Sequence, residues 1–197
     1  QLAGCDNDHP YSKLDRFRIL AVRADLPDLR EGQTATLDAL TYTPDAASVT
    51  HRWSWCPWTL GSNDGFTCVV TQADLDTLGL PLPPLDLGTE PTAHFAYPGS
   101  AALVQGLCES FLSGLPPASR KNFPDCAVVM PVTIQLTVSD GETDLVAVKE
   151  IDLLVDPGRP PNQNPTLVDL SASNGGAAFA VEDASALVPT EDYTLEV

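Results

Sequence analysis

The sequence predicts a mostly β fold: an antiparallel β-sandwich that carries a disulfide-stapled, partly helical insertion. Three observations support this prediction. Short segments near both ends of the predicted domain alternate apolar and polar residues, which is typical of strands with one buried face. The chain has 18 prolines and many Thr, Ser, Asp and Gly residues, which favour turns and short strands. Four of the five cysteines lie between residues 56 and 126.

Three strands are predicted at the start of the sandwich. The two-residue period places Phe17, Ile19 and Ala21 on one face of the first strand. The same period points Ala35 and Leu37 of the second strand towards the core. The predicted strands cover residues 17–23, 33–42 and 49–56.

A hairpin over residues 132–155 is the clearest local prediction. Its first strand alternates apolar and polar residues, at Val132, Ile134, Leu136 and Val138 and at Thr133, Gln135 and Thr137. Asp140 and Gly141 predict a tight turn, because glycine readily adopts positive φ. The alternation of the return strand shifts near Lys149 and Glu150, which indicates a β-bulge.

Residues 57–130 break the strand pattern and predict an insertion across one end of the sandwich. A proline-rich stretch at 81–84 is expected to be extended. One helix is expected over 100–112, with Ser100 as its cap and an apolar stripe at helical spacing. Gly114 and the prolines that follow it end this helix.

The four clustered cysteines form two pairs of near neighbours, Cys56 with Cys68 and Cys108 with Cys126. We expect a disulfide within each pair, which would stabilise the fold by roughly 3 kcal/mol in the chain-entropy model. A structural metal or free thiols are the alternatives, although no Cys-x2-Cys spacing with nearby histidines supports zinc. Disulfides indicate an oxidising compartment.

The fifth cysteine, Cys5, ends the segment Leu2-Ala3-Gly4-Cys5. This segment resembles the lipobox of bacterial lipoproteins. The resemblance implies that residues 1–4 are removed, that Cys5 carries the acyl chains and that the protein is anchored in a membrane of the bacterial cell envelope. The alternative is a free cysteine near the terminus. Under the lipobox interpretation, residues 1–15 are the lipobox and a polar N-terminal tether.

The order of the first strands resembles immunoglobulin-like β-sandwich modules of bacterial envelope proteins. A strand with Glu31-Gly32-Gln33-Thr34-Ala35-Thr36-Leu37 precedes a strand with a central tryptophan, Trp53. In such modules this tryptophan packs between the sheets. The inter-sheet disulfide of antibody domains is not carried over, because Cys56 follows Trp53 on the same strand.

The domain organisation follows from these segments. We expect a sandwich over 16–156 with the insertion 57–130, and a proline-rich linker over 157–165. Residues 166–197 are too few for an independent domain. They are either the start of a second β module or a tail that donates a strand.

Charge limits the range of partners. The chain has 27 acidic against 10 basic residues, a net charge of −17, and no basic patch for nucleic acid. No cofactor is expected, except that clustered carboxylates suit calcium. The best calcium candidates are Asp140, Glu142 and Asp144, although no EF-hand loop is present and the Asp140 turn has its own structural reason.

No catalytic constellation is visible in the sequence, and we expect no enzyme. The three histidines, His9, His51 and His94, lie in different segments, and neither a nucleophile elbow nor a phosphate-binding glycine loop is present. A hydrolase whose site has no sequence motif is the remaining enzymatic hypothesis. A cleft with two close carboxylates would reveal it.

Trp53, Trp55 and Trp58 lie close together in the sequence. The favoured interpretation is that Trp53 lies in the core and that Trp55 and Trp58 pack under the insertion. The alternative is a carbohydrate-binding module in which exposed Trp55 and Trp58 stack on sugar rings.

These features predict a non-catalytic, lipid-anchored envelope protein on the periplasmic or cell-surface face of a membrane. It would act as a structural or protein-binding module, or as a subunit of a surface assembly. The insertion is its expected working surface, because irregular segments on a rigid scaffold carry recognition. Other envelope or surface proteins are the expected partners, and glycans are the alternative.

Overall fold

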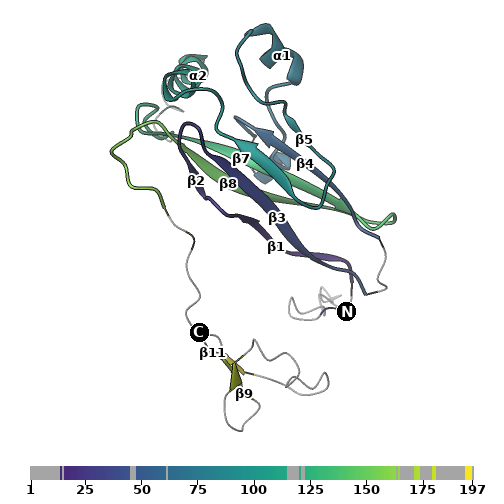
Figure 1. The fold of residues 1–197 in the computed structure, drawn as a ribbon. Helices are drawn as coiled ribbons and strands as arrows, with labels where there is room; N and C mark the ends of the chain where they lie inside the picture. The colour runs from purple at the N-terminus through teal and green to yellow at the C-terminus, as the bar shows by residue number, and fades with distance from the viewer. Residues whose placement is uncertain are drawn as a thin grey trace, which may run out of the picture. The chain divides into compact units, whose positions relative to one another are not determined.

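The structure is a computed structural model, and it describes most of the chain. Its described residues are 14, 16–44, 48–60, 62–114, 120, 123–162 and 164, with only the backbone at 63, 171–173, 179–180 and 194–196. The chain separates into two compact units, Gln1–Gln163 and Asn164–Val197. Among its described residues, the first unit is mostly β, with two sheets, two α-helices and one short 3-10 helix, η1 (Figure 1).

The smaller sheet of the first unit is antiparallel and has three strands in the order β1-β3-β6. Its strands are β1 (Arg18–Ala24), β3 (Thr34–Tyr42) and β6 (Ala93–Ala96). Ala35 and Leu37 are fully buried on β3, as the alternation predicts.

The prediction for the face of Ala21 is wrong. The register between β1 and β3 shifts between Ile19 and Ala21, so that the chain carries a bulge at Leu20. Beyond the bulge the pattern is inverted: Ala21 is exposed and Ala24 is buried. One extra residue is enough to exchange the two faces of a strand.

The larger sheet has five strands in the order β2-β8-β7-β4-β5. All its pairings are antiparallel except that of β2 with β8, which is parallel. Its strands are β2 (Asp28–Leu29), β4 (Thr50–Cys56), β5 (Asp86–Gly88), β7 (Val129–Ser139) and β8 (Asp144–Leu154).

The predicted hairpin is formed by β7 and β8, with Gly141 at a φ of 94° in its turn. The bulge predicted near Lys149 is absent, because the ladder runs in unbroken register from Val129–Leu154 to Ser139–Asp144. Lys149 occupies a position of β8 that faces the core side of the sheet, and it is half-buried. A charged residue at this position interrupts the apolar alternation of the strand in the sequence. The long aliphatic stem of Lys149 can cover apolar surface there while the ammonium group reaches water.

The core lies between the two sheets, which pack face to face. Trp55 of the larger sheet contacts Phe95 of the smaller one, with ring centroids 5.2 Å apart. The Tyr97 hydroxyl donates a hydrogen bond to the Leu154 carbonyl at 3.2 Å and ties the two sheets at one end. Burial, followed by the nearby Glu31 carboxylate, raises the pKa of Tyr97 to about 12, which keeps this donor protonated.

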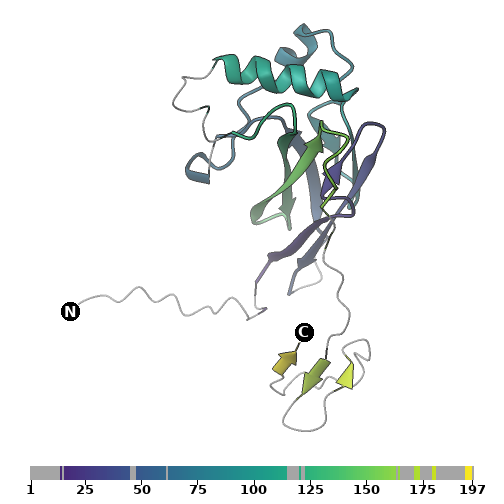
Figure 2. The ribbon, with the colours of Figure 1, turned by 90° about the vertical axis from the view of Figure 1, so that its left-hand side faces the viewer.

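The predicted single insertion over 57–130 is corrected to two insertions, because β5 and β6 in its middle belong to the two sheets. The first insertion contains η1 (Ser62–Asp64) and α1 (Gln72–Thr77), and the second contains α2 (Ala101–Gly114). Both helices lie at the same end of the sheets (Figures 1 and 2).

Helix α2 matches its prediction closely. The Ser100 hydroxyl accepts a hydrogen bond from the Leu103 N–H at 3.3 Å, and Gly114 is the last helical residue. The Glu31 carboxylate accepts a second bond from the Ala101 N–H at 3.0 Å, which fixes the helix start to the turn before β3. A carboxylate at this helix end is also favoured by the helix dipole.

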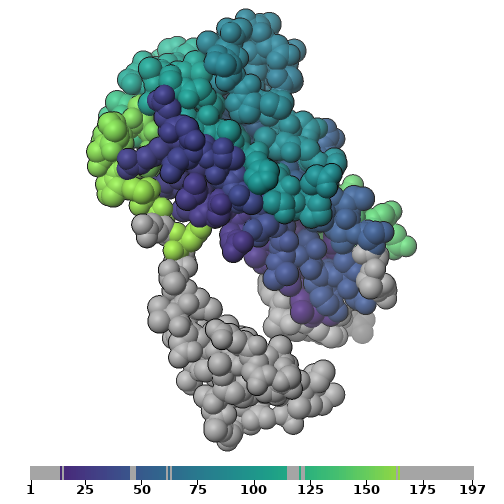
Figure 3. All heavy atoms as spheres, in the orientation of Figure 1, coloured from purple at the N-terminus to yellow at the C-terminus, as the bar shows by residue number. Residues whose placement is uncertain are grey.

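Residues 156–162, the last predicted residue of the sandwich and the first part of the predicted linker, lie against β2 and the turn that follows it (Figure 3). We call this segment the strap. The Arg30 guanidinium donates hydrogen bonds to the carbonyls of Pro157 and Arg159, and the buried Asp28 carboxylate accepts one from the Asn162 N–H. Arg159 also pairs with Asp152 at 3.7 Å.

The second unit contains a small antiparallel sheet in the order β10-β9-β11. Its strands are β9 (Ser171–Ser173), β10 (Phe179–Ala180) and β11 (Thr194–Glu196). The predicted tether and lipobox, 1–15, lie outside the described residues except for Leu14.

The surroundings of Asp152, next to the strap, lead us to expect that its ionisation makes the stability of the fold depend on pH. Burial, the facing Asp28 and then Glu150 raise the pKa of Asp152 above its ordinary value of 3.8, and Arg159 opposes them. The folded chain therefore holds this proton more tightly than the unfolded chain, so ionisation of Asp152 costs stability as pH rises through its native pKa. Asp152→Asn should be more stable than the wild type at pH 7, and the difference should vanish below pH 3.8.

Urea denaturation across this pH range measures the effect. Asp144→Asn, at an exposed position of the same strand, is the control with the same change in net charge. Greater destabilisation by Asp152→Asn than by Asp144→Asn at pH 7 would contradict the prediction and would mean that the Arg159 pair dominates.

Candidate functional site

The structure joins the cysteines in the pairing that the sequence favours. Cys56 is bonded to Cys68 and Cys108 to Cys126, each with a Cα–Cα distance of 5.6 Å. The first bridge closes the start of the first insertion onto β4, and the second ties α2 to the segment before β7. Cys5 lies outside the described residues.

Trp53 and Trp55 are core residues, with exposed fractions of 0% and 2%. Their indole N–H groups donate hydrogen bonds to the carbonyls of Glu90 at 3.1 Å and Pro84 at 2.8 Å. Trp55 is therefore not the exposed sugar platform of the alternative hypothesis, because both its ring and its polar atom are satisfied inside the fold.

Trp58 joins the two insertions. Its ring stacks on Phe111 of α2, with centroids 4.2 Å apart and planes 8° from parallel, and Phe123 meets Phe111 edge-on at 5.9 Å. Phe123 is 39% exposed, and Leu60 and Val69, on the two segments joined by the Thr59–Cys68 bridge beside Trp58, are 45% and 44% exposed. We call this group the apolar end cluster; its residues are Trp58, Leu60, Val69, Phe111 and Phe123.

A small hairpin-like turn positions the first part of this cluster. Thr59 and Cys68 form an isolated antiparallel bridge, and the Val69 N–H donates to the Trp58 carbonyl at 3.0 Å. Residues opposite each other in an antiparallel pair project to the same side, so Trp58 and Val69 share a side. The Cys56–Cys68 disulfide fixes this turn to the sheet.

The carboxylates proposed for calcium form a turn instead of a gathered ligand set. Asp140 accepts hydrogen bonds from the N–H groups of Thr143 at 2.8 Å and Glu142 at 3.0 Å, and these bonds lower its pKa. Across the described residues, no three His, Cys, Asp or Glu side chains lie close enough together to hold a metal ion. Asp140, Glu142 and Asp144 therefore do not form such a group.

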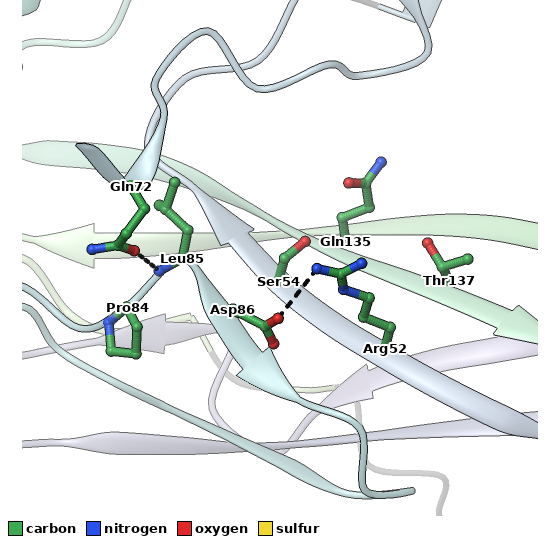
Figure 4. A pocket seen from close by; sticks show the side chains of 8 residues that line it. All are labelled: Arg52, Ser54, Gln72, Pro84, Leu85, Asp86, Gln135 and Thr137. Carbon is green, nitrogen blue, oxygen red and sulfur yellow. Dashed lines mark hydrogen bonds and ion pairs between the residues drawn. The ribbon is translucent and has the colours of Figure 1, made fainter. Parts of the chain in front are cut away.

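The larger sheet carries an open pocket of about 500 Å³ on its outer face (Figure 4). We call it the sheet pocket. Its floor comes from β4 and β7, and one wall comes from α1 and the Pro84–Asp86 segment that leads into β5. Its polar lining consists of Arg52, Ser54, Gln72, Asp86, Gln135 and Thr137.

Strand register brings the floor residues together. Arg52 pairs with Thr137 and Ser54 with Gln135 in the β4–β7 ladder, and all four occupy the outward positions that alternate with the buried core. Because neighbouring pairs in a ladder lie on a rigid surface, these side chains keep a fixed spacing.

A capping box on α1 sets the wall of the sheet pocket. Thr71 and Asp74 exchange side-chain and backbone hydrogen bonds at the start of α1, which places Gln72 in the first turn. The Gln72 amide oxygen then accepts a bond from the Leu85 N–H at 2.8 Å, while its nitrogen donates to Asp76 at 2.7 Å.

The sheet pocket contains both satisfied and unsatisfied polar groups. Arg52 pairs with Asp86 at 3.3 Å, and Asp86 also accepts a bond from the Gly88 N–H at 2.9 Å. Within the part of the chain that the structure describes, the side chains of Ser54, Gln135 and Thr137 make no hydrogen bond. Donors and acceptors therefore face the solvent from a rigid floor.

Sequence reasoning missed the sheet pocket. The alternation marked Gln135 and Thr137 only as outward residues, and the wall belongs to a proline-rich stretch in which no strand was predicted. The available signal was the pairing of two outward polar faces on adjacent strands, which becomes visible only once β4 is known to lie beside β7.

Neither helix of the described chain combines the length and apolar character of a membrane span. The chain matches no protein-family model, no curated protein and no solved structure.

The disulfides predict a large stability difference. Replacing Cys108 and Cys126 together by serine opens a loop with a sequence separation of 18, and should lower the free energy of unfolding by about 3 kcal/mol. Urea denaturation measures this loss, and alkylation of the unreduced wild-type chain should leave these two cysteines unmodified. An unchanged unfolding midpoint, or labelled cysteines, would contradict the pairing.

Proposed function

We propose that the chain is a non-catalytic, lipid-anchored module of the bacterial cell envelope that binds another envelope protein through the end of a β-sandwich. The observation that carries the proposal is the apolar end cluster, held in place by both disulfides and by the Trp58–Phe111 stack. The disulfides and the stack restrict the motion of these apolar residues while leaving several of them exposed to solvent.

The strand order supports an immunoglobulin-like sandwich. Immunoglobulin-type domains pair strands A, B and E in one sheet and G, F and C in the other, and some add a strand C′ beside C. In chain order, β1, β3 and β6 correspond to A, B and E, and β4, β5, β7 and β8 to C, C′, F and G. Buried Trp53 lies on the strand that corresponds to C.

The two disulfides support a location outside the reducing cytoplasm. The lipobox-like Leu2-Ala3-Gly4-Cys5 supports acylation at Cys5. Two or more acyl chains would hold the protein stably at a membrane surface, whereas one would do so marginally.

The composition of the apolar end cluster supports protein binding. Aromatic residues are enriched at protein interfaces. Phe123 exposes apolar surface beside the Trp58–Phe111 stack, and Leu60 and Val69 expose more on the segments that flank Trp58. The chain carries a net charge of −17, so solubility does not require these residues to be buried. Carbohydrate stacking on Trp55 and Trp58 loses its basis, because Trp55 is buried and one face of Trp58 is covered by Phe111.

The anchor is tested by the intact mass of the protein purified from its native membrane. The expected mass begins at Cys5 and includes acyl chains, and Cys5→Ser should shift the protein from the membrane to the soluble fraction. Cys56→Ser with Cys68→Ser, which removes other thiols, is the control and should leave the acyl mass in place. An unmodified Cys5 in the native protein would overturn the anchor.

The binding surface is tested by a charge placed in the apolar end cluster. Phe123→Asp should abolish a complex that the wild type retains during purification from its membrane. Leu40→Asp, at a position 60% exposed on the other sheet, is the matched control and should keep the complex. The proposal requires that the captured protein binds the purified wild type directly, and equal binding by both variants would refute it.

A further inference from the structure

The sheet pocket shares no residue with the anchor or with the apolar end cluster, so the function proposed above leaves it unexplained. We propose that the sheet pocket is a binding site for a small neutral saccharide. The proposal rests on its volume, its hydrogen-bonding groups, its charge balance and its apolar wall.

The volume suits a small ligand. At about 500 Å³ the sheet pocket falls within the range of small-molecule sites and can accept roughly one or two sugar rings. Its floor is a hydrogen-bonded sheet, so the spacing of the polar groups is set before a ligand arrives. Preorganisation of this kind reduces the entropy lost on binding.

The hydrogen-bonding groups match sugar hydroxyls. An amide and a hydroxyl can each donate and accept, and a sugar hydroxyl does both as well. Gln135, Ser54 and Thr137 offer such groups without a competing partner among the described residues. Figure 4 shows Gln135 and Thr137 beside Arg52 and Ser54, across the sheet from Leu85 and Pro84.

The Arg52–Asp86 pair adds fixed planar groups. Only one guanidinium nitrogen contacts Asp86, at 3.3 Å, so other N–H donors of Arg52 remain available. Planar guanidinium and carboxylate groups can each bind two neighbouring oxygen atoms, which is the arrangement of vicinal sugar hydroxyls. Gly88 holds the second oxygen of Asp86 through its N–H at 2.9 Å and so orients the carboxylate.

Charge favours a neutral ligand. The lining contains one cation and one anion, and these neutralise each other. A phosphate or carboxylate ligand would meet no unpaired cation in the sheet pocket, and the −17 charge of the chain would repel it.

The remaining lining separates a saccharide from a peptide. Pro84 and Leu85 give an apolar wall on which the C–H face of a sugar ring can rest. An extended peptide would instead add to a free strand edge. Both floor strands are already paired on each side, β4 with β5 and β7, and β7 with β4 and β8, so only side chains can reach a ligand from the floor. The wall strand β5 is the edge of the sheet, but its three residues offer only a short edge to a peptide.

The test uses nuclear magnetic resonance of the isotope-labelled full chain with four neutral disaccharides: lactose, maltose, cellobiose and diacetylchitobiose. At about 10 mM sugar, which detects even a Kd in the millimolar range, at least one should shift the Gln135 side-chain amide and the backbone amides of Ser54 and Thr137. Glucuronic acid is the anionic comparison and should bind more weakly than the best neutral sugar.

Two variants make the result specific. Gln135→Ala and Thr137→Val should each raise the Kd by a factor of about three to ten, the effect of one lost hydrogen bond. Gln105→Ala, on the surface of α2, is the matched control and should leave the Kd unchanged. The proposal is overturned if none of the four sugars shifts these amides, if the shifts map elsewhere, if Gln105→Ala weakens binding equally, or if glucuronic acid binds most tightly.

Discussion

The register of β4 against β7 determines which side chains of these two strands face the core and which face the sheet pocket. Trp53 pairs with Leu136 and Trp55 with Ile134, and all four are buried. The alternating pairs place Arg52, Ser54, Gln135 and Thr137 on the outer face. A slip of one residue would exchange the two sets and expose both tryptophans, so burial of the core and formation of the sheet pocket depend on the same pairing.

The two tryptophans also position the segment around β5, which has little regular secondary structure. The indole groups hold the carbonyls of Pro84 and Glu90 on either side of β5, a strand of only three residues. Gln72 holds the Leu85 N–H from the opposite side. The wall of the sheet pocket is thus fixed from the core and from α1 together. The two insertions at the sandwich end are likewise fixed by a few contacts, one aromatic stack and two disulfides.

Sequence reasoning worked where a local pattern decides the structure. The β7–β8 hairpin, the helix from Ala101 to Gly114 and the inward alanine and leucine of β3 follow from period, turn and cap signals. Sequence reasoning failed at Leu20, where one extra residue exchanges the buried and exposed faces of β1. It also failed at Lys149, where a charged residue occupies a position that faces the core side of the sheet. Short strands such as β5 and β6 carry too few residues to show a period. The sheet pocket combines residues from 52 to 137, and no local pattern reports a juxtaposition over that separation.

The parallel pairing of β2 with β8 has a mechanical consequence. The chain enters the sandwich through β1 and β2 and leaves it through β8 and the strap, which returns to Arg30 and Asp28 next to β2. A pull on the two ends of this unit therefore slides β2 and β8 past each other, and their hydrogen bonds share the load instead of opening one at a time. Detaching the strap requires breaking the bonds of Arg30 and Asp28 as well. A chain held before β1 and pulled beyond the strap would bear that tension in shear between β2 and β8 and in the bonds of the strap.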